Sequence, residues 1–173
     1  MNAPLEATVV ATPVGPLAIV VDDGTVVASG FTTLDDQLDR LPQVLRDRGV
    51  VVRDDLGPVT DAVHAYLAGD VAALDAVPVR QPGGPFMQEA WREMRQIPPG
   101  QTWSYAELAA KSGNPSAVRA AGSACARNMV APFVPCHRVV RSGGALGGYY
   151  YGLATKRWLL DHESGVTQTS LPA

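Results

Sequence analysis

A segment rich in glycine and proline, Gln81-Pro82-Gly83-Gly84-Pro85, divides the chain into two parts with different sequence patterns. Consecutive prolines and glycines disfavour both helix and strand, so this segment is predicted to be a linker. A length of 173 residues allows one domain or two small ones. We therefore expect an N-terminal structural domain over residues 1–82 and a C-terminal domain over residues 83–173.

The N-terminal part begins with β-like runs separated by turn residues. Residues 7–11, 17–21 and 26–31 are rich in β-branched and apolar side chains, and Asp22-Asp23-Gly24 is typical of a tight turn between strands. Residues 76–79 form a further candidate strand. The pattern predicts a small antiparallel sheet.

Two helices are predicted in the same part of the chain. Leucines three or four positions apart mark an apolar helical face over residues 34–45, although Pro42 makes a helix start near that residue an equal possibility. Residues 58–67 repeat the pattern, with Pro58 suited to a first helical turn. The expected fold of this part is therefore an α/β layer.

The C-terminal part is predicted to be mainly helical. One helix follows the linker, and Pro98-Pro99-Gly100 ends it. Ser104 is a candidate N-cap for a short helix that runs to about Lys111, and Asn114 is a candidate N-cap for a helix over residues 116–127. Two short helices joined by a turn with glycine predict a helix-turn-helix.

Charge is divided unevenly between the two parts. Residues 1–82 hold five basic and twelve acidic side chains, a net charge of −7, whereas residues 83–173 hold nine and five, a net charge of +4. The C-terminal part is thus the candidate for an anionic partner, although chance segregation of surface charge is an equal alternative. Neither a secretory signal nor an apolar run long enough to span a membrane is evident, so we expect a cytoplasmic protein that does not enter membranes.

The two cysteines, Cys125 and Cys136, provide neither a disulfide framework nor a zinc ligand set. Cys136 stands in the run Val-Pro-Cys-His-Arg-Val-Val, where His137 and an arginine follow it directly. A nearby base or cation raises the thiolate fraction of a cysteine, so Cys136 is a candidate nucleophile. Asp161 and Glu163 are candidates to orient the imidazole. A buried cysteine beside a core histidine is the alternative.

The predicted helix before this motif carries almost no side-chain bulk over residues 120–124. Gly122 costs such a helix about 1 kcal/mol relative to alanine, which indicates a close approach to its backbone. Tight packing between helices is one explanation, and a partner outside the chain is another. Arg119 is the one large side chain on this face.

Together these residues resemble the O6-alkylguanine-DNA alkyltransferases, also called methylated-DNA–protein-cysteine methyltransferases. The similarity covers about residues 85–163, through SYAELAAKSGNPSAVRAAGSACARN, PCHRVV and GGALGGYYYGLATKRWLLDHE. A looser likeness in the N-terminal part, through TPVGPL and HAYLAGD, implies a ribonuclease-H-like α/β domain. The resemblance implies direct-reversal DNA repair in a single-turnover reaction, without a cofactor or metal, by a monomer that binds double-stranded DNA containing O6-alkylguanine.

The resemblance also implies roles for individual residues of the reaction. Cys136 would accept the alkyl group, His137 would act as a base through a water, and Glu163 would orient His137. Tyr105 would press on the phosphate next to the lesion and protonate the leaving guanine. Asn128 would brace the turn that carries the cysteine.

For DNA binding, the resemblance implies that Arg119 takes the place of the nucleotide that is rotated out of the duplex. The bare helix face would then enter the minor groove without reading sequence. That face comprises Ala120, Gly122 and Ser123. The implied substrate pocket comprises Val139, Tyr149, Tyr150, Tyr151 and Lys156.

The chain departs from the family pattern at two places near the site. Residues 128–132 read Asn-Met-Val-Ala-Pro instead of Asn-Pro-x-Pro, and residues 149–152 read Tyr-Tyr-Tyr-Gly instead of Tyr-x-Gly-Gly. The second departure places the bulky rings of Tyr150 and Tyr151 beside the alkyl pocket.

Three other functions compete with this reading. A non-catalytic damage sensor of similar sequence would lack the cysteine, which this chain has. A transcription regulator would carry base-reading side chains on the second helix, where this chain has alanines. A hydrolase with a Cys-His pair would need an oxyanion-binding motif, and none is visible.

Overall fold

The computed structural model describes residues 3–165, and within them the chain forms two compact units. The first unit comprises residues up to Gln81 together with Met129–Phe133. The second comprises Pro82–Asn128 and the chain from Val134 on, so the last eight residues of the predicted C-terminal domain lie outside the described residues.

The first unit is built on a four-stranded sheet with the strand order β3-β2-β1-β4. Its strands are β1 (Leu5–Thr12), β2 (Gly15–Asp22), β3 (Thr25–Gly30) and β4 (Val50–Val52). The first three are antiparallel, as predicted, and Asp23 and Gly24 both have positive φ in the tight turn between β2 and β3.

The prediction of a purely antiparallel sheet is wrong at its edge, because β4 pairs with β1 in parallel. The expected strand over residues 76–79 is reduced to one parallel bridge between Val79 and Val26. The segment Met129–Phe133 also contributes to this unit, since Ser29 N donates to Met129 O (2.8 Å) and Met129 N donates to Gln81 Oε1 (2.7 Å).

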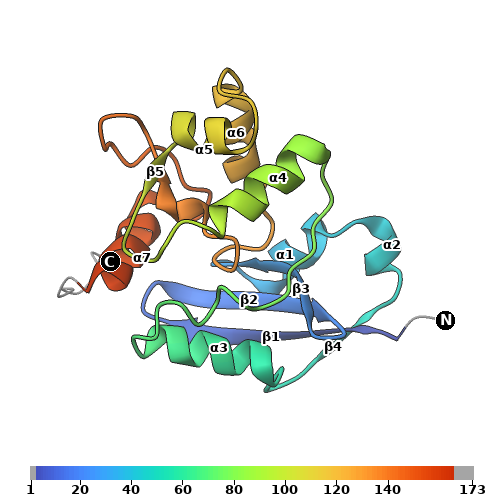
Figure 1. Cartoon of the computed structure of the whole chain (residues 1–173). Helices are drawn as coiled ribbons and strands as arrows, with labels where there is room; N and C mark the ends of the chain where they lie inside the picture. The colour runs from blue at the N-terminus through green and yellow to red at the C-terminus, as the bar shows by residue number, and fades with distance from the viewer. Residues whose placement is uncertain (1–2, 166–173) are drawn as a thin grey trace. The chain divides into compact units, whose positions relative to one another are not determined.

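Three helices accompany the sheet, and Figure 1 shows the longest of them alongside β1. They are α1 (Leu34–Arg40), α2 (Gln43–Arg46) and α3 (Pro58–Leu67). The prediction of one helix over residues 34–45 is corrected to two, because Pro42 cannot continue a helix and precedes α2. The apolar face of these short helices still covers the sheet, where Leu34, Leu38 and Leu45 pack on a core that includes Leu5 and Val20.

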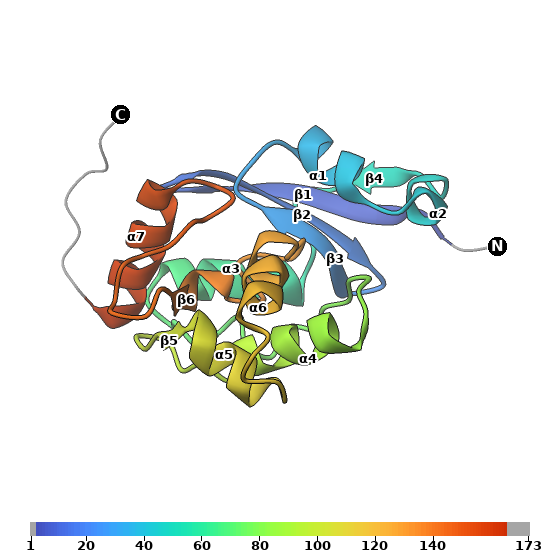
Figure 2. The same ribbon diagram turned by 90° about the horizontal axis from the view of Figure 1, so that it is seen from above.

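The second unit is mainly helical. Its helices are α4 (Pro85–Met94), α5 (Tyr105–Lys111), α6 (Val118–Ala126), the 3-10 turn η1 (Cys136–Arg138) and α7 (Leu153–Ser164). The short strands β5 (Trp103–Ser104) and β6 (Val139–Val140) pair in parallel. Helices α4, α5 and α6 pack against one another (Figure 2), and Trp91 Nε1 of α4 donates to the carbonyl of Ala124 in α6 (2.8 Å).

One of the two predicted helix caps in this unit is correct. Ser104 caps α5 by accepting a hydrogen bond from Glu107 N (3.0 Å). Asn114 does not cap the next helix, because its side chain accepts from Ser116 N (3.2 Å) in a local turn instead. Helix α6 therefore begins at Val118, after an N-cap residue, Ala117, that makes no side-chain hydrogen bond.

Candidate active site

Cys136 is the first residue of η1 and lies on the wall of a cavity. Its backbone N–H donates to Val134 O (2.9 Å), and only 6% of the residue is exposed. The cavity has a volume of about 200 Å3 and is lined by Tyr105, Gly122, Cys125, Ala126, Cys136, Gly148, Tyr149 and Tyr150. The thiol is therefore sheltered from bulk water at a place where a small molecular fragment fits.

Asn128 holds the turn that precedes the cysteine. Its side-chain amide donates to Val134 O (2.7 Å), the same oxygen that accepts from Cys136 N. Because Asn128 is buried, this hydrogen bond has little competition from water. One asparagine thus fixes the backbone on which the thiol is mounted.

A buried ionic cluster lies directly after the cysteine. His137 Nε2 and Glu163 Oε2 are 2.8 Å apart, and Arg138 binds both oxygens of the same carboxylate, through Nε (2.8 Å) and Nη2 (3.0 Å). Arg138 Nη1 also donates to Ile97 O (2.8 Å). The carboxylate of α7 therefore fixes two consecutive residues of η1.

The electrostatics of this cluster favour an ionised Glu163. Burial alone would raise the pKa of Glu163, but His137 and Arg138 more than offset burial and lower it below its usual range. Since Nε2 of His137 faces the carboxylate, Nδ1 is the ring nitrogen left for proton transfer. This Nδ1 is buried and makes no hydrogen bond to any residue that the structure describes.

Lys156 organises the loop between β6 and α7. Its fully buried amine donates to three backbone carbonyls, those of Val139 (2.8 Å), Leu146 (2.5 Å) and Gly148 (3.1 Å). Burial lowers the pKa of this amine, while the nearby cysteine sulfurs act in the opposite direction. Lys156 therefore acts on the cavity by fixing its wall at Gly148 rather than by lining it.

The three consecutive tyrosines do not all reach the cavity. Tyr149 and Tyr150 line it, and Tyr150 is 64% exposed, which places it at the opening. Tyr151 lies outside the lining and packs edge-on against both, with ring centroids 5.7 Å from Tyr149 and 4.9 Å from Tyr150. Of the three tyrosines expected in the substrate pocket, Tyr149 and Tyr150 line this cavity and Tyr151 does not.

Tyr105 faces the cavity from the first turn of α5. Burial raises the pKa of its hydroxyl, and the sulfurs of Cys125 and Cys136 raise it further. The backbone at Gly147, which has φ +71°, passes so close to the Tyr105 ring that an added Cβ would lie 2.8 Å from Tyr105 Oη. A glycine is required at this crossing, which brings the loop against the hydroxyl.

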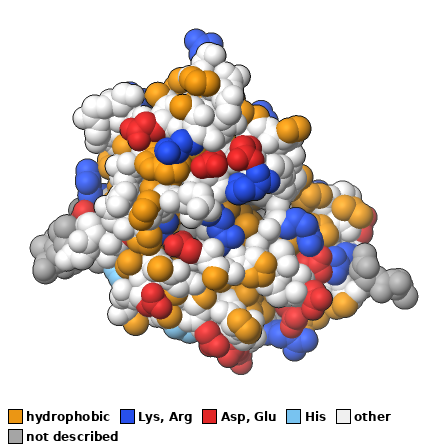
Figure 3. All heavy atoms as spheres, in the orientation of Figure 1, with side chains coloured by type: hydrophobic (Ala, Val, Ile, Leu, Met, Phe, Trp, Pro, Cys, Tyr) orange, Lys and Arg blue, Asp and Glu red, His pale blue; other side chains and the backbone are white. Residues whose placement is uncertain are grey.

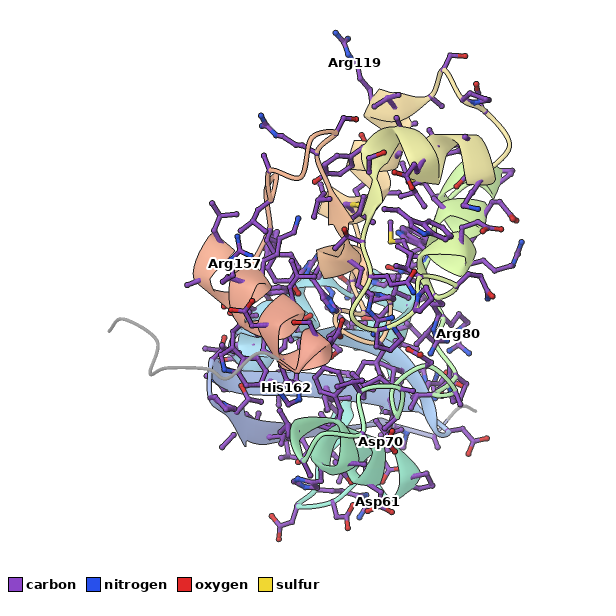
Figure 4. All side chains as sticks on the ribbon, turned by 60° about the vertical axis from the view of Figure 1, so that its left-hand side comes forward. Asp61, Asp70, Arg80, Arg119, Arg157 and His162 are labelled. Carbon is purple, nitrogen blue, oxygen red and sulfur yellow. The ribbon has the colours of Figure 1, made fainter. Side chains whose placement is uncertain are left out.

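The exposed side of α6 is bare, as predicted. A Cβ added to Gly122 would meet no atom within 4 Å, so packing inside the protein does not explain the glycine. Ala120 and Ser123 are half-buried, whereas Ala121 and Ala124 are fully buried. Arg119 points outward from α6, away from the neighbouring helices (Figure 4).

Basic side chains do not gather in one place on the face drawn in Figure 3, where they alternate with acidic and apolar ones. Within residues 3–165, no group of three or more His, Cys, Asp or Glu side chains could hold a metal ion. No helix in this range is long and apolar enough to cross a membrane.

Two residues of the site were missed in the sequence. The sequence shows Arg138 only as a neighbour of the cysteine, because its partners, Glu163 and Ile97, are 25 and 41 residues away. Cys125 shares the cavity with Cys136, and its position on α6 one turn after Gly122 was the available signal.

Comparisons with known proteins agree with this arrangement. Residues 85–165 match the family model described as the DNA-binding domain of 6-O-methylguanine DNA methyltransferase. The chain is 38% identical over 160 residues to a methylated-DNA–protein-cysteine methyltransferase of Salmonella typhimurium, with 89% of this chain and 92% of the relative covered. A constitutive methyltransferase of the same name from Bacillus subtilis is 34% identical over 142 residues, with 82% and 84% covered.

Solved structures show the same similarity. The O6-methylguanine methyltransferase of Mycobacterium tuberculosis superposes with a TM-score of 0.75 at 29% identity, covering 95% of this chain and 96% of that one. A Mycobacterium tuberculosis protein named OGT, in complex with DNA, gives a TM-score of 0.76 at 30% identity, with 92% and 93% covered. These findings confirm the resemblance predicted from the sequence: the chain belongs to the family of methylated-DNA–protein-cysteine methyltransferases.

Proposed function

We propose that this chain repairs O6-alkylguanine in DNA by direct reversal and transfers the alkyl group to its own Cys136. The observation that carries the proposal is the position of the Cys136 thiol on the wall of a small cavity, directly before a histidine that is bound to a buried carboxylate. The two relatives described above, both named methylated-DNA–protein-cysteine methyltransferases, support it.

The reaction is a displacement at the alkyl carbon. The Cys136 sulfur forms a bond to that carbon while the bond from the carbon to O6 of guanine breaks, and the thiol proton passes through a water to Nδ1 of His137. Glu163 keeps the ring oriented and stabilises the imidazolium, and Arg138 holds the Glu163 carboxylate in place. Tyr105, which lines the same cavity, donates its proton to the leaving guanine. Water then carries the proton held by His137 to Tyr105, so the thiol proton is in effect passed to the guanine. The thioether product is not cleaved by any group in the site, so each molecule reacts once.

The duplex binds, in this proposal, through α5, the following turn and α6, which act as a helix-turn-helix. The minor groove is about 6 Å wide and admits a helix face without large side chains, such as that around Gly122. Arg119 then fills the gap that the extruded nucleotide leaves, at a cost of unstacking of a few kcal/mol. Such contacts read no sequence, which suits a lesion that occurs anywhere in a genome.

Inside the site, the carbonyl oxygens of Cys136 and Val139 accept from the exocyclic amine of the guanine. Val139 O already accepts one hydrogen bond from Lys156, and a carbonyl oxygen has a second lone pair for the base. Lys156 thereby positions an oxygen that identifies guanine.

Tyr149 and Tyr150 limit the size of the alkyl group. A benzyl group must fit beside the Cys136 sulfur in a cavity of about 200 Å3 whose wall includes both rings. Overfilling a packed site costs about 1–3 kcal/mol, more than the 0.5–1.5 kcal/mol that an aromatic contact returns. Tyr150→Gly should therefore narrow the difference in single-turnover rate between O6-methylguanine and O6-benzylguanine in DNA. If the difference in rate between the two substrates is unchanged, Tyr150 does not limit the size of the alkyl group.

The N-terminal part, residues 1–82, has a ribonuclease-H-like arrangement and serves as a structural domain, and residues 83–173 bind DNA and accept the alkyl group. The chain acts as a monomer in the cytoplasm, where reducing conditions keep Cys136 available as a thiol.

The test is the intact mass of the protein after incubation with excess duplex that contains one O6-methylguanine. We expect a gain of about 14 Da, one methylene equivalent per chain, with no further gain on longer incubation. A damage sensor or a transcription regulator would bind the duplex without any change in mass. A hydrolase would turn over repeatedly and leave the protein unmodified.

A further inference from the structure

The first unit contains a cleft that is larger than the cavity beside Cys136. Its volume is about 500 Å3, against about 200 Å3 for that cavity. The cleft lies between α3, the turn that joins β2 to β3, and the segment 73–78. Its wall is formed by Asp23, Gly24, Leu56, Pro58, Val59, Ala62, Ala73, Ala76, Val77 and Pro78. A cleft of this size with a mostly apolar wall is typical of sites that bind small organic molecules.

Hydrogen bonds hold the walls of the cleft in place. Val26 N donates to Pro78 O (2.9 Å), which ties the segment 73–78 to β3. On the other side, the Thr60 hydroxyl accepts from Leu56 N (3.1 Å) and so fixes the chain that enters α3. A cleft that is formed before binding loses less free energy to ordering when a ligand enters.

Asp23 is the one polar side chain among the lining residues that the structure describes. Its carboxylate forms no hydrogen bond or ion pair with any residue in the range 3–165. The neighbouring acid, Asp22, is bound by Arg48 (2.8 Å) and Arg80 (2.6 Å). The charge of Asp22 is thus compensated inside the protein, whereas that of Asp23 is left for a ligand.

The chain around the cleft is acidic. Residues 54–79 contain five aspartates and neither lysine nor arginine, and His64 is their one basic side chain. The positive N-terminal end of α3 is offset by Asp55, whose carboxylate accepts from Gly57 N (2.7 Å). The local field therefore attracts cations and repels anions such as phosphates.

The charge of Asp23 limits what can cover the apolar wall. A neutral ligand over this carboxylate would exclude water without replacing the hydrogen bonds that water makes, which is unfavourable. An anion would be repelled by the carboxylate. An ammonium group can bind the carboxylate by a charge-assisted hydrogen bond while the rest of the molecule fills the apolar cleft.

A small molecule fits the cleft better than a protein surface does. Specific protein interfaces bury at least about 1,000 Å2, with an apolar centre that extends beyond a single pocket. Residues 54–79, all of them described by the structure, expose no large apolar side chain. The apolar surface therefore ends at the rim of the cleft, and a protein partner would rest on acidic side chains.

We propose that this cleft binds a small organic cation, a primary amine with an apolar body. The ammonium group pairs with the carboxylate of Asp23, and the apolar body packs on the wall formed by Val59, Ala62 and Val77. Binding is non-covalent. The proposal does not rest on the repair function, because the cleft lies wholly in the first unit and the Cys136 cavity lies in the second.

The test is an NMR titration of the full chain, followed on its backbone amides, with probes of similar shape and different charge. Tryptamine is a cation, tryptophol is neutral and indoleacetate is an anion. We expect saturable shifts in the cleft with tryptamine, about 10-fold weaker binding of tryptophol, and no binding of indoleacetate. Asp23→Asn should weaken the binding of tryptamine about 10-fold and leave that of tryptophol unchanged. Asparagine tolerates the positive φ of this turn position, so the variant keeps the turn.

Asp70→Asn is the matched control for charge. It removes the same charge from an exposed position outside the cleft wall, and should change the binding of tryptamine by less than about two-fold. Ala62→Phe fills the cleft and should weaken the binding of tryptamine and tryptophol alike by about 10-fold or more. Ala72→Phe, at an exposed alanine that does not line the cleft, is its control and should bind like the wild type. Circular dichroism checks that each variant is folded.

The absence of saturable shifts with tryptamine would overturn the proposal. Equal binding of tryptamine and tryptophol, or of tryptamine to the wild type and Asp23→Asn, would also overturn it, because Asp23 would then have no part in recognition. Shifts confined to Tyr105, Cys136 and their neighbours would show that the probe enters the other cavity instead. Methyl transfer is measured separately, without any probe, so its failure would contradict the proposed repair function and leave the amine site standing.

Discussion

Each unit of the chain contains a carboxylate bound by two basic side chains, and the two clusters differ in their exposure to water. In the first unit, Asp22 accepts from Arg48 (2.8 Å) and Arg80 (2.6 Å), and these three side chains are 18%, 15% and 56% exposed. In the second unit, Glu163 binds His137 and Arg138, and no side chain of the three is more than 1% exposed. The Asp22 cluster is thus in contact with solvent, whereas the Glu163 cluster is buried.

Exposure decides what each cluster can do. Ion pairs in contact with water contribute about 0–1 kcal/mol, because solvent screens them and the side chains lose entropy. Removal of one partner from a buried pair leaves an uncompensated charge, which costs about 3–5 kcal/mol. The Asp22 cluster therefore joins β2 to distant segments at small gain, whereas the Glu163 cluster holds a histidine in one orientation.

The largest expected effect comes from Glu163→Gln. The variant should lower the free energy of unfolding by about 3–5 kcal/mol, since the buried guanidinium of Arg138 loses its counter-ion. Single-turnover methyl transfer should slow by about 100-fold or more, because the proposed mechanism needs His137 to be oriented as a general base. Urea denaturation and a quench-flow assay measure the two effects.

Asp161→Asn is the matched control for that experiment. Asp161 lies on α7 two residues before Glu163 and was the other candidate to orient the histidine, but His137 pairs with Glu163. Transfer should remain within a factor of about two of the wild type, as for other partly exposed positions. An equal loss of transfer in the two variants would contradict the assignment.

Arg138→Lys should have an intermediate effect. Lysine keeps the charge but cannot bind both oxygens of Glu163 and Ile97 O with one planar group, so we expect a loss of about 1–3 kcal/mol in stability. The apparent pKa for transfer should change together with the rate if Arg138 acts through Glu163 and His137. A change in stability with an unchanged pH profile of transfer would make Arg138 merely structural.

The two clusters should lose their contributions to stability at different pH values as the solution is made acidic. The pKa of Asp22 is lowered from 3.8 to about 2, chiefly by the hydrogen bond from Arg48, so its contribution is complete above pH 3.8 and is lost as the pH falls to about 2. The pKa of Glu163 is depressed further, which extends the loss of its contribution to lower pH. The stability difference between wild type and Asp22→Asn should vanish near pH 2, while that for Glu163→Gln persists. If both stability differences decline together as the pH falls, the proposed contrast between the two clusters is wrong.

The smallest expected effect is that of Asp22→Asn at neutral pH. We expect a loss of about 1 kcal/mol in the free energy of unfolding and an unchanged rate of methyl transfer. High salt should reduce the loss, since this cluster is in contact with solvent. Thermal unfolding at two salt concentrations measures the effect. A loss of stability as large as that of Glu163→Gln would show that the two clusters do not differ in strength.

Features that depend on a few neighbouring residues were predictable from the sequence. Pro58 marks the first residue of α3 and Ser104 caps α5, because both act within one helical turn. Asn114 was assigned wrongly since its side chain bonds two residues on, at Ser116, where the sequence allows either a cap or a turn. The edge strand β4 has only three residues, and its pattern of valines is too short to show a period.

Features that depend on distant residues were predictable only through the family resemblance. The pairing of His137 with Glu163 spans 26 residues, and spacing alone left Asp161 as an equal candidate. The anchoring of Arg138 on Ile97 O has no local signal. The order of the tyrosines along the loop did not reveal that Tyr149 and Tyr150, rather than Tyr151, line the cavity.

The central claim is that Cys136, and not the thiol beside it, accepts the methyl group. The most direct measurement is tandem mass spectrometry of peptides from the wild-type chain after reaction with duplex DNA that carries a labelled O6-methyl group. The account predicts one label per chain, on the sulfur of Cys136, and none on Cys125. Label on Cys125, or on neither cysteine while the DNA is repaired, would contradict it.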